Sequence, residues 1–245
     1  MHESCKGKSV RFQVNGVSHE GVGEESLLCS LRRYGYEVPS LCHHEAVSPY
    51  GACRLCLVEV RKGRKTKVTT SCNYPLLEGS EVFLDTPTVV RHRKTVLQLL
   101  LAMAPKAGAV REIAEQYGVT ETPFEPNQDN DCILCGLCNR VCKEVVEADA
   151  IGFAGRGYKK TMSSPYDEVN DACIGCGACA VVCPTNCIGL KEENNIRTLE
   201  KWHRRLPMKM CKKCGLSFAP TFQLNHFAKA INKDPSFFDI CVDCR

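Results

Sequence analysis

Alternating apolar and polar residues near the start of the chain predict a half-buried strand, whose apolar side carries Val10, Phe12 and Val14. The Asn15-Gly16 pair that follows is typical of a hairpin turn. The next apolar stripe has helical spacing, is expected to end near Gly35, and consists of Leu27, Leu28 and Leu31. Further strands are predicted at residues 57–60 and 67–72, separated from that helix by a long loop.

Two helical patterns follow in a connector at residues 87–128, which ends in the stretch TPFEPNQ. The first predicted face consists of Val96, Leu99, Leu100 and Met103. The second consists of Val110, Ile113, Ala114 and Tyr117. Beyond residue 128 the stretch GFAGRGYKKTMSSPYDE predicts a hairpin with a loop.

Cysteine sets this composition apart, with 19 among 245 residues. The N-terminal stretch MHESCKGKSVRF has no apolar run typical of a signal peptide. No segment approaches the roughly 20 apolar residues of a membrane span. We therefore expect a cytoplasmic chain with reduced thiols, in which grouped cysteines are metal ligands. A net charge of +4 is too small to indicate nucleic-acid binding.

Two groups of cysteines repeat with a period of 41 residues and read CILCGLCNRVC and CIGCGACAVVCP. Both have the C-x2-C-x2-C-x3-C spacing of bacterial ferredoxins that bind 4Fe-4S clusters. Three cysteines of each loop are expected to bind one cluster, while the fourth reaches the other. One cluster is thus assigned to Cys132, Cys135, Cys138 and Cys183, and the other to Cys142, Cys173, Cys176 and Cys179. Zinc binding and unligated thiols are the alternatives.

Another group, Cys42, Cys53, Cys56 and Cys72, has ten residues in its first gap, whereas plant-type 2Fe-2S ferredoxins have four. The predicted strands and helix around it nevertheless fit a β-grasp domain. Such a domain binds two irons with three cysteines from one loop and one from a distant strand. His43 and His44 follow Cys42, and their use as Rieske-type ligands is an alternative.

The last group, Cys211, Cys214, Cys241 and Cys244, forms two CxxC pairs that resemble the knuckles of a zinc ribbon. The 26 residues between the pairs exceed the usual zinc spacing. They are expected to form a small helix and an apolar plug from Phe218, Phe222, Leu224, Phe227 and Ile231. Zinc is the favoured metal, and a further iron–sulfur cluster is the alternative; His226 is a spare candidate ligand. The three remaining cysteines, Cys5, Cys29 and Cys187, are expected to pack as small side chains.

The stretches PSLCHHEAVSPYGACRLCLVEV and TSCNYPLLEGSEVFLDTP closely resemble the 2Fe-2S domain of the complex I iron–sulfur (75 kDa-type) subunit. The same domain opens the small diaphorase subunit of NAD-linked hydrogenases and many iron-only hydrogenases. The resemblance covers roughly residues 8 to 190. After the stretch RHRKTVLQLLLA the family has a further cluster site, made of one histidine and three cysteines. This chain has no His or Cys between His92 and Cys132, so that cluster cannot form.

The predicted fold class is α+β, in four parts. These are a β-grasp 2Fe-2S domain (1–86), a helical connector (87–128), a two-cluster 4Fe-4S ferredoxin domain (129–200) and a four-cysteine metal domain (201–245). Neither a GxGxxG fingerprint after a strand nor a Walker loop is present, so no catalytic residue, flavin or NAD is assigned to the chain.

The function expected from these features is electron transfer. The resemblance implies as partners an NAD(P)H-oxidising flavoprotein subunit, a thioredoxin-like 2Fe-2S subunit, and a hydrogenase or formate dehydrogenase subunit. It also allows electron bifurcation with ferredoxin. Two alternatives are a redox-sensing zinc-ribbon regulatory protein and a free multi-cluster ferredoxin.

Overall fold

The structure is a computed structural model that describes residues 8–23 and 25–245. The chain divides into two compact units, Met1–Cys135 and Gly136–Arg245. Cys5, which the sequence predicts as a packed side chain, lies outside the described residues. Within those residues, no helix is both long and apolar enough to cross a membrane.

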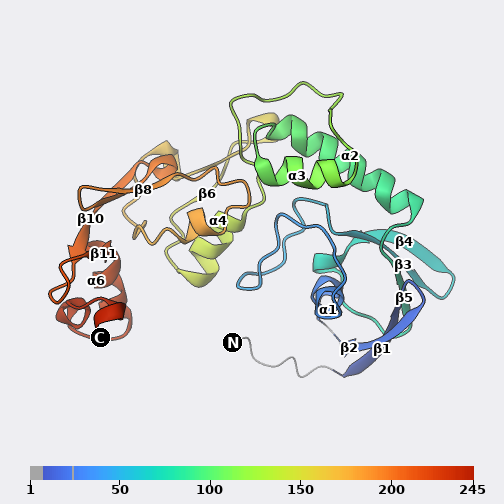
Figure 1. Ribbon diagram of the computed structural model, residues 1–245, viewed down its shortest axis with the longest axis horizontal. Coiled ribbons are helices and arrows are strands. Elements are labelled where there is room, and N and C mark those ends of the chain that lie inside the picture. Colours follow the sequence, from blue (N-terminus) through green and yellow to red (C-terminus); the bar gives the residue numbers. More distant parts are fainter. Residues whose placement is uncertain (1–7, 24) are drawn as a thin grey trace. The chain divides into compact units, whose positions relative to one another are not determined.

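The first unit is built on a five-stranded sheet in the order β2-β1-β5-β3-β4 (Figure 1). Its strands are β1 (Ser9–Val14), β2 (Val17–Val22), β3 (Leu57–Lys62), β4 (Lys65–Thr70) and β5 (Ser80–Phe83). The β1–β5 pair is parallel and the other pairs are antiparallel. The predicted first strand and the hairpin turn at Asn15-Gly16 are confirmed by the register, which pairs Val14 with Val17.

Helix α1 (Leu27–Arg33) packs its apolar stripe into the core of this unit, as the sequence predicts. Its first turn is capped by Ser26, whose side chain accepts a hydrogen bond from the backbone N–H of Cys29. The core joins this helix to the three central strands of the sheet and contains Phe12, Val14, Leu27, Leu28, Leu31, Val58, Val60, Leu76 and Val82.

Helices α2 (Pro87–Met103) and α3 (Gly108–Gln116) pack side by side (Figure 1). The predicted face of α3 is confirmed, since Val110 and Ala114 are buried. The predicted face of α2 is wrong at Leu99, which is 47% exposed, while Leu97 and Arg93 are fully buried. Because α2 contacts both α3 and β3, its buried side is broader than one apolar stripe and includes a charged residue.

The second unit contains a four-stranded antiparallel sheet in the order β11-β10-β9-β8. Its strands are β8 (Leu190–Glu193), β9 (Ile196–Leu199), β10 (Arg204–Met210) and β11 (Ser217–Pro220). The separate hairpin of β6 (Gly152–Ala154) and β7 (Thr161–Ser163) confirms the one predicted between the two ferredoxin runs. The short helices of the runs are α4 (Leu137–Arg140), continued by a π-helical turn (Val141–Val145), and α5 (Ala178–Val181).

Strands β9 and β10 pair across the boundary predicted at residues 200/201, so one sheet joins the two flanking segments. The predicted C-terminal helix is α6 (Thr221–Ala230). Its apolar plug is smaller than expected: Leu224 is buried, whereas Phe222, Phe227 and Ile231 are 43%, 37% and 51% exposed. Helix α6 packs against β10, β11 and the 3-10 turn Pro235–Phe238, and these three apolar residues remain partly at the surface.

Candidate metal centres

All four cysteines of the N-terminal group are buried in the first unit. Cys42 and Cys53 lie in the loop between α1 and β3, and Cys56 directly precedes β3. Cys72 lies in a 3-10 turn (Ser71–Asn73) just after β4, whereas the sequence placed it at the end of that strand. The backbone N–H and the hydroxyl of Ser71 both donate to the carbonyl of Cys56, at 2.8 and 2.9 Å. This turn therefore fixes Cys72 beside the ligand loop.

The chemistry of these four thiols fits an iron–sulfur cluster. The backbone N–H groups of Leu41 and Cys53 point at the sulfurs of Cys53 and Cys42, at 3.4 Å in both cases. A hydrogen bond from Cys72 lowers the pKa of Cys56 to about 6, and the same contact raises the pKa of Cys72. The four thiols cannot readily all lose their protons without bound metal, and metal binding would release them.

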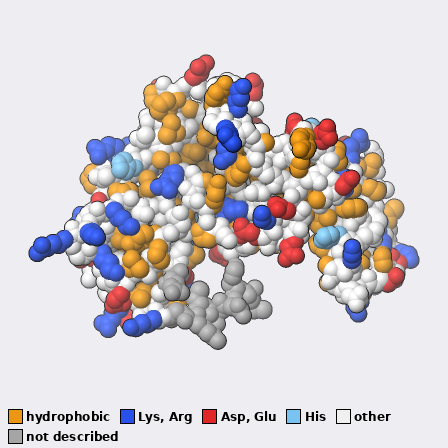
Figure 2. Space-filling model, turned by 180° about the vertical axis from the view of Figure 1, so that it is seen from behind, with side chains coloured by type: hydrophobic (Ala, Val, Ile, Leu, Met, Phe, Trp, Pro, Cys, Tyr) orange, Lys and Arg blue, Asp and Glu red, His pale blue; other side chains and the backbone are white. Residues whose placement is uncertain are grey.

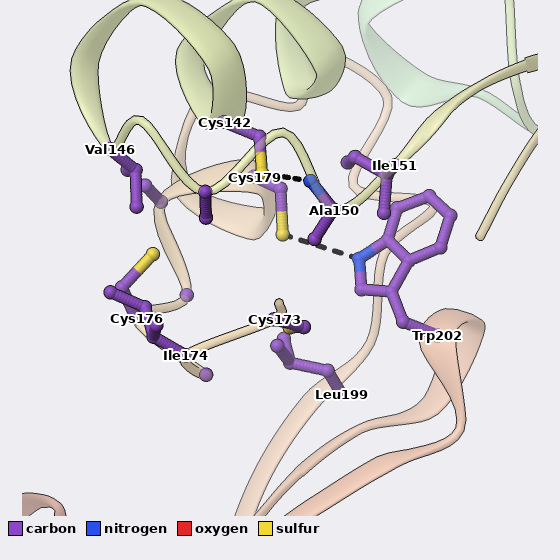
Figure 3. A pocket seen from close by; sticks show the side chains of 14 residues that line it. Cys142, Val146, Ala150, Ile151, Cys173, Ile174, Cys176, Cys179, Leu199 and Trp202 are labelled. Atoms are coloured by element: carbon purple, nitrogen blue, oxygen red, sulfur yellow. Dashed lines mark hydrogen bonds between the residues drawn. The ribbon is translucent and has the colours of Figure 1, made fainter. Parts of the chain in front are cut away.

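Four cysteines of the second unit line one cavity: Cys142, Cys173, Cys176 and Cys179 (Figure 3). The first ferredoxin run supplies Cys142, through the π-helical turn after α4, and the second run supplies the other three. The rest of the lining is largely apolar and includes Ile151, Ile174, Leu199 and Trp202. Four thiols in an apolar pocket are the donor set and surroundings that a 4Fe-4S cluster requires.

The sulfurs of this cavity also accept hydrogen bonds from nitrogen donors. The backbone N–H of Ala150 lies 3.4 Å from Cys142 Sγ, and Trp202 Nε1 lies 3.3 Å from Cys179 Sγ (Figure 3). Burial raises the pKa of Cys179 to about 12 even though the indole N–H lowers it, and burial also raises the pKa values of Cys142 and Cys173. The cavity therefore favours thiolates only when a cation compensates their charge.

The four cysteines predicted to bind the other cluster are divided between the two compact units. Cys132 and Cys135 end the first unit, while Cys138 on α4 and Cys183 after α5 belong to the second. Within the first unit, the Asn130 side chain donates to the carbonyls of Met103 and Cys132, at 2.7 and 2.8 Å, and accepts from the Cys132 N–H. This amide ties the start of the ligand loop to the end of α2. The assignment of these four cysteines to one cluster stays a prediction.

The sulfurs of Cys211, Cys214, Cys241 and Cys244 all lie within 4.8 Å of one another in the second unit. Cys211 follows β10, and its sulfur accepts from the N–H groups of Lys213 and Cys241, both at 3.4 Å. Backbone N–H groups, that of Cys241 foremost and then those of Cys214 and Lys213, lower the pKa of Cys211 to about 6. The chain bends tightly after Cys214, where Gly215 has a φ of +74° that favours glycine. Four convergent sulfurs fit a tetrahedral metal ion.

Asp239 forms ion pairs beside this C-terminal site. Its carboxylate pairs with Lys209 at 2.6 Å and Lys212 at 2.5 Å, and its carbonyl accepts from the Lys212 N–H. The two lysines flank Cys211 in sequence, and Asp239 lies two residues before Cys241. The carboxylate therefore connects the two CxxC segments without contributing a sulfur.

Two cysteines outside the four groups, and the histidines that follow Cys42, contact nearby sulfur or backbone atoms. Cys187 Sγ lies 3.6 Å from Cys183 Sγ, and this contact raises the pKa of Cys183. Cys29 is half-buried, with its sulfur 4.0 Å from Nε2 of His43. His44 accepts a hydrogen bond at Nδ1 from the Ala46 N–H, at 3.1 Å.

The segments that carry the first three groups of cysteines match models of known domain families. Residues 7–87 match the 2Fe-2S iron-sulfur cluster binding domain. Residues 127–190 and 172–219 match two 4Fe-4S dicluster domains. The chain thus contains one 2Fe-2S domain and a 4Fe-4S dicluster region, with helices and sheets in both.

Several curated proteins are similar over most of this chain. An NADH-quinone oxidoreductase subunit of Rhizobium meliloti is 27% identical over 73% of the chain. The NADP-reducing hydrogenase subunit HndD of Solidesulfovibrio fructosivorans is 29% identical over 66%, and the NADH-ubiquinone oxidoreductase 75 kDa subunit of Reclinomonas americana is 28% identical over 74%. The chain is similar to these oxidoreductase and hydrogenase subunits.

The matches cover only part of each relative. The chain spans 24% of the Rhizobium protein, 33% of the hydrogenase subunit and 29% of the 75 kDa subunit. A solved structure of an NAD+-reducing NiFe-hydrogenase aligns with a TM-score of 0.56 at 26% identity, over 64% of this chain and 75% of that one. The chain thus spans a third or less of the length of these three curated relatives.

Helices α2 and α3 form the connector in which the sequence lacks the site of one histidine and three cysteines. The bend between them buries Ala104 and Ala107, which are 0% and 2% exposed. Small apolar side chains therefore fill the inside of this bend.

Sequence reasoning missed Trp202 and Arg93. Trp202 lies 23 positions after Cys179, outside every cysteine motif and within the segment predicted as the C-terminal metal domain. Arg93 interrupts an apolar face, so its burial could not be read from the pattern. The only available signal was that Trp202 is the single tryptophan of the chain.

Proposed function

We propose that this chain is an electron-transfer subunit of a multi-subunit NAD(P)H-linked oxidoreductase. The supporting observation is the arrangement of its cysteines in sets of four, because a cluster ligated by four thiolates has no open position for substrate. Such clusters carry single electrons, with potentials set by their surroundings. The relatives named as subunits of NADH-quinone oxidoreductase and NADP-reducing hydrogenase support the same assignment.

The proposed cofactors are one 2Fe-2S cluster and two 4Fe-4S clusters. The N-terminal cysteines would hold the first within a β-grasp domain, and the crossed sets from the two ferredoxin runs would hold the others. The chain's own residues bury the sulfurs and direct backbone N–H groups at them, as at Leu41, Cys53 and Ala150. The four-domain division of the sequence is part of this proposal.

We further propose that the C-terminal site holds zinc in a ribbon-like domain. The four sulfurs of the two CxxC segments lie close together, so a zinc ion would have four thiolate ligands and no open position. Zinc has no redox chemistry, and this site would therefore stabilise the fold rather than carry electrons. An additional iron centre at the same four cysteines is the alternative.

The proposed partners are an NAD(P)H-oxidising flavoprotein subunit, a thioredoxin-like 2Fe-2S subunit, and a hydrogenase or formate dehydrogenase catalytic subunit. The complex would be cytoplasmic, and ferredoxin would join it if it bifurcates electrons. Lys and Arg side chains are interspersed with Asp and Glu on the face shown in Figure 2, which supports protein partners over nucleic acid.

The direct test is anaerobic purification of the tagged chain from its native host, followed by EPR before and after addition of NADH or NADPH. We expect a flavin-containing subunit to co-purify and the clusters to be reduced by one of the two nucleotides. The proposal fails if dithionite reduces the clusters but neither nucleotide does so in a preparation that contains the flavoprotein.

A further inference from the structure

Trp202 lies at the cavity of the second ferredoxin run although it belongs to no cysteine motif. It ends the 3-10 turn Glu200–Trp202 between β9 and β10, and its side chain is 1% exposed. Its ring forms part of the cavity lining beside Ile151 and Leu199 (Figure 3). The indole Nε1 donates to Cys179 Sγ at 3.3 Å. An N–H donor thus points at a sulfur inside a pocket with a largely apolar lining.

The strands on both sides of Trp202 hold the cysteine loop in place. Arg204 on β10 donates through Nε to the Cys173 carbonyl at 3.0 Å and pairs with Asp171, also at 3.0 Å. Arg197 on β9 donates to the Gly175 carbonyl at 3.0 Å. These contacts attach β9 and β10 to the loop that carries three of the four cysteines, so the indole is held where the sulfur lies.

The loop and the sheet also approach each other too closely for a larger residue. A Cβ placed on Gly175 would lie 2.4 Å from Leu206 Cδ1 on β10, and the φ of Gly175 is +71°. Glycine therefore permits both the conformation of the loop and its contact with the strand. The position of Trp202 is determined by this packing as well as by its own hydrogen bond.

We propose that Trp202 is a positioning residue that raises the reduction potential of the cluster held by Cys142, Cys173, Cys176 and Cys179. The inference rests on the proposed function, because it requires that cluster to be bound. One-electron reduction places additional negative charge on the cluster and its sulfurs. A fixed N–H donor at Cys179 stabilises that charge, and its effect is strengthened by the low dielectric of the buried site.

The test is Trp202→Phe in the cluster-loaded protein, since phenylalanine keeps an aromatic ring and removes the N–H. Redox titration followed by EPR should show one 4Fe-4S cluster becoming harder to reduce. We expect a change of about tenfold in its reduction equilibrium, which is 59 mV for a one-electron couple. The 2Fe-2S cluster of the first unit should keep its potential and serves as the internal control.

Tyr158→Phe is the matched control variant, because Tyr158 is an aromatic donor of the same unit that is 95% exposed. Its cluster potentials should equal those of the unsubstituted protein. The inference is overturned if Trp202→Phe retains its iron and all potentials stay unchanged. Absence of the cluster from the unsubstituted protein would instead contradict the proposed function, so the two failures are distinguishable.

A second measurement covers the case in which Trp202→Phe loses the cluster. Trp202 is the single tryptophan of the sequence, so biosynthetic incorporation of a ring-fluorinated tryptophan alters this position alone. Fluorine makes the indole N–H a stronger donor while the side chain retains its shape. The potential of the same cluster should then rise, and an unchanged potential in the fluorinated protein would overturn the inference.

Discussion

At the scale of single residues, Arg93 shows how a buried charge can stabilise a small unit. Its side chain is 1% exposed. It donates to Asp85 at 2.8 Å, to the Tyr117 hydroxyl at 2.7 Å and to the Leu57 carbonyl at 2.5 Å. These contacts connect α2 with β3 and with the residue that ends α3. A buried guanidinium is stable only when it is paired in this way.

Replacement of Arg93 by methionine should therefore destabilise the first unit. The apolar stem would be kept, but three hydrogen bonds would be lost and the Leu57 carbonyl would be left without this donor. We expect the free energy of unfolding to fall by about 2–3 kcal/mol. Anaerobic urea unfolding followed by circular dichroism measures the change. Arg91→Met, on the exposed side of the same helix, should have little effect; equal losses in both variants would contradict this role.

Cys142 is the residue that tests crossed ligation. Its sequence neighbours are Cys135 and Cys138, yet its side chain lines the cavity of Cys173, Cys176 and Cys179. Cys142→Ser should therefore damage the cluster of the second run and leave that of its own run intact. Mössbauer or EPR spectra of the two clusters distinguish the outcomes. Cys187→Ser is the matched control and should retain both clusters; damage to the other cluster by Cys142→Ser would refute the crossing.

At the scale of elements, the sheet β8–β11 connects two kinds of site. Its β9 and β10 strands contact the cysteine loop through Arg197 and Arg204, while the end of β10 leads into Cys211. A segment predicted as a separate metal domain thus supplies Trp202 to the lining of the cavity that contains Cys142, Cys173, Cys176 and Cys179.

Cys241→Ser tests what the C-terminal site contributes. If the site holds zinc, the substitution should remove about one zinc per chain and weaken subunit assembly, while the spectra of the three clusters persist. Elemental analysis, EPR and analytical size exclusion measure the three effects. His226→Ala is a suitable control, because four cysteines complete the site without it. Loss of an EPR signal in Cys241→Ser, with no zinc in the unsubstituted protein, would show an iron centre instead.

At the scale of the whole molecule, iron is expected to be the main determinant of stability. A fully loaded chain should contain about 10 irons and matching sulfide, from one 2Fe-2S and two 4Fe-4S clusters. Because metal–thiolate bonds supply much of the folding free energy of such domains, the metal-free chain should lose most of its ordered structure. Anaerobic iron and sulfide analysis with circular dichroism checks both points. About four irons or fewer in a loaded preparation would contradict the assignment.

The sequence alone determined the features that depend on local spacing. Cysteines with only two or three residues between them lie on one short loop whatever the rest of the fold does, so the ferredoxin runs could be recognised directly. The alternation at Val10, Phe12 and Val14 and the Asn15-Gly16 turn likewise predicted β1 and its hairpin, because strand period and turn geometry are local properties.

Only the tertiary structure decided which distant groups meet. Leu99 fits a helical stripe as well as Leu97 does, but contacts with α3 and β3 selected which side of α2 is buried, and that side includes Arg93. Trp202 could not be connected with Cys179 from the sequence, because the hydrogen bond depends on how β9 and β10 pack onto the cysteine loop. Local patterns specify elements, whereas burial and long-range hydrogen bonds depend on packing that no short stretch of sequence contains.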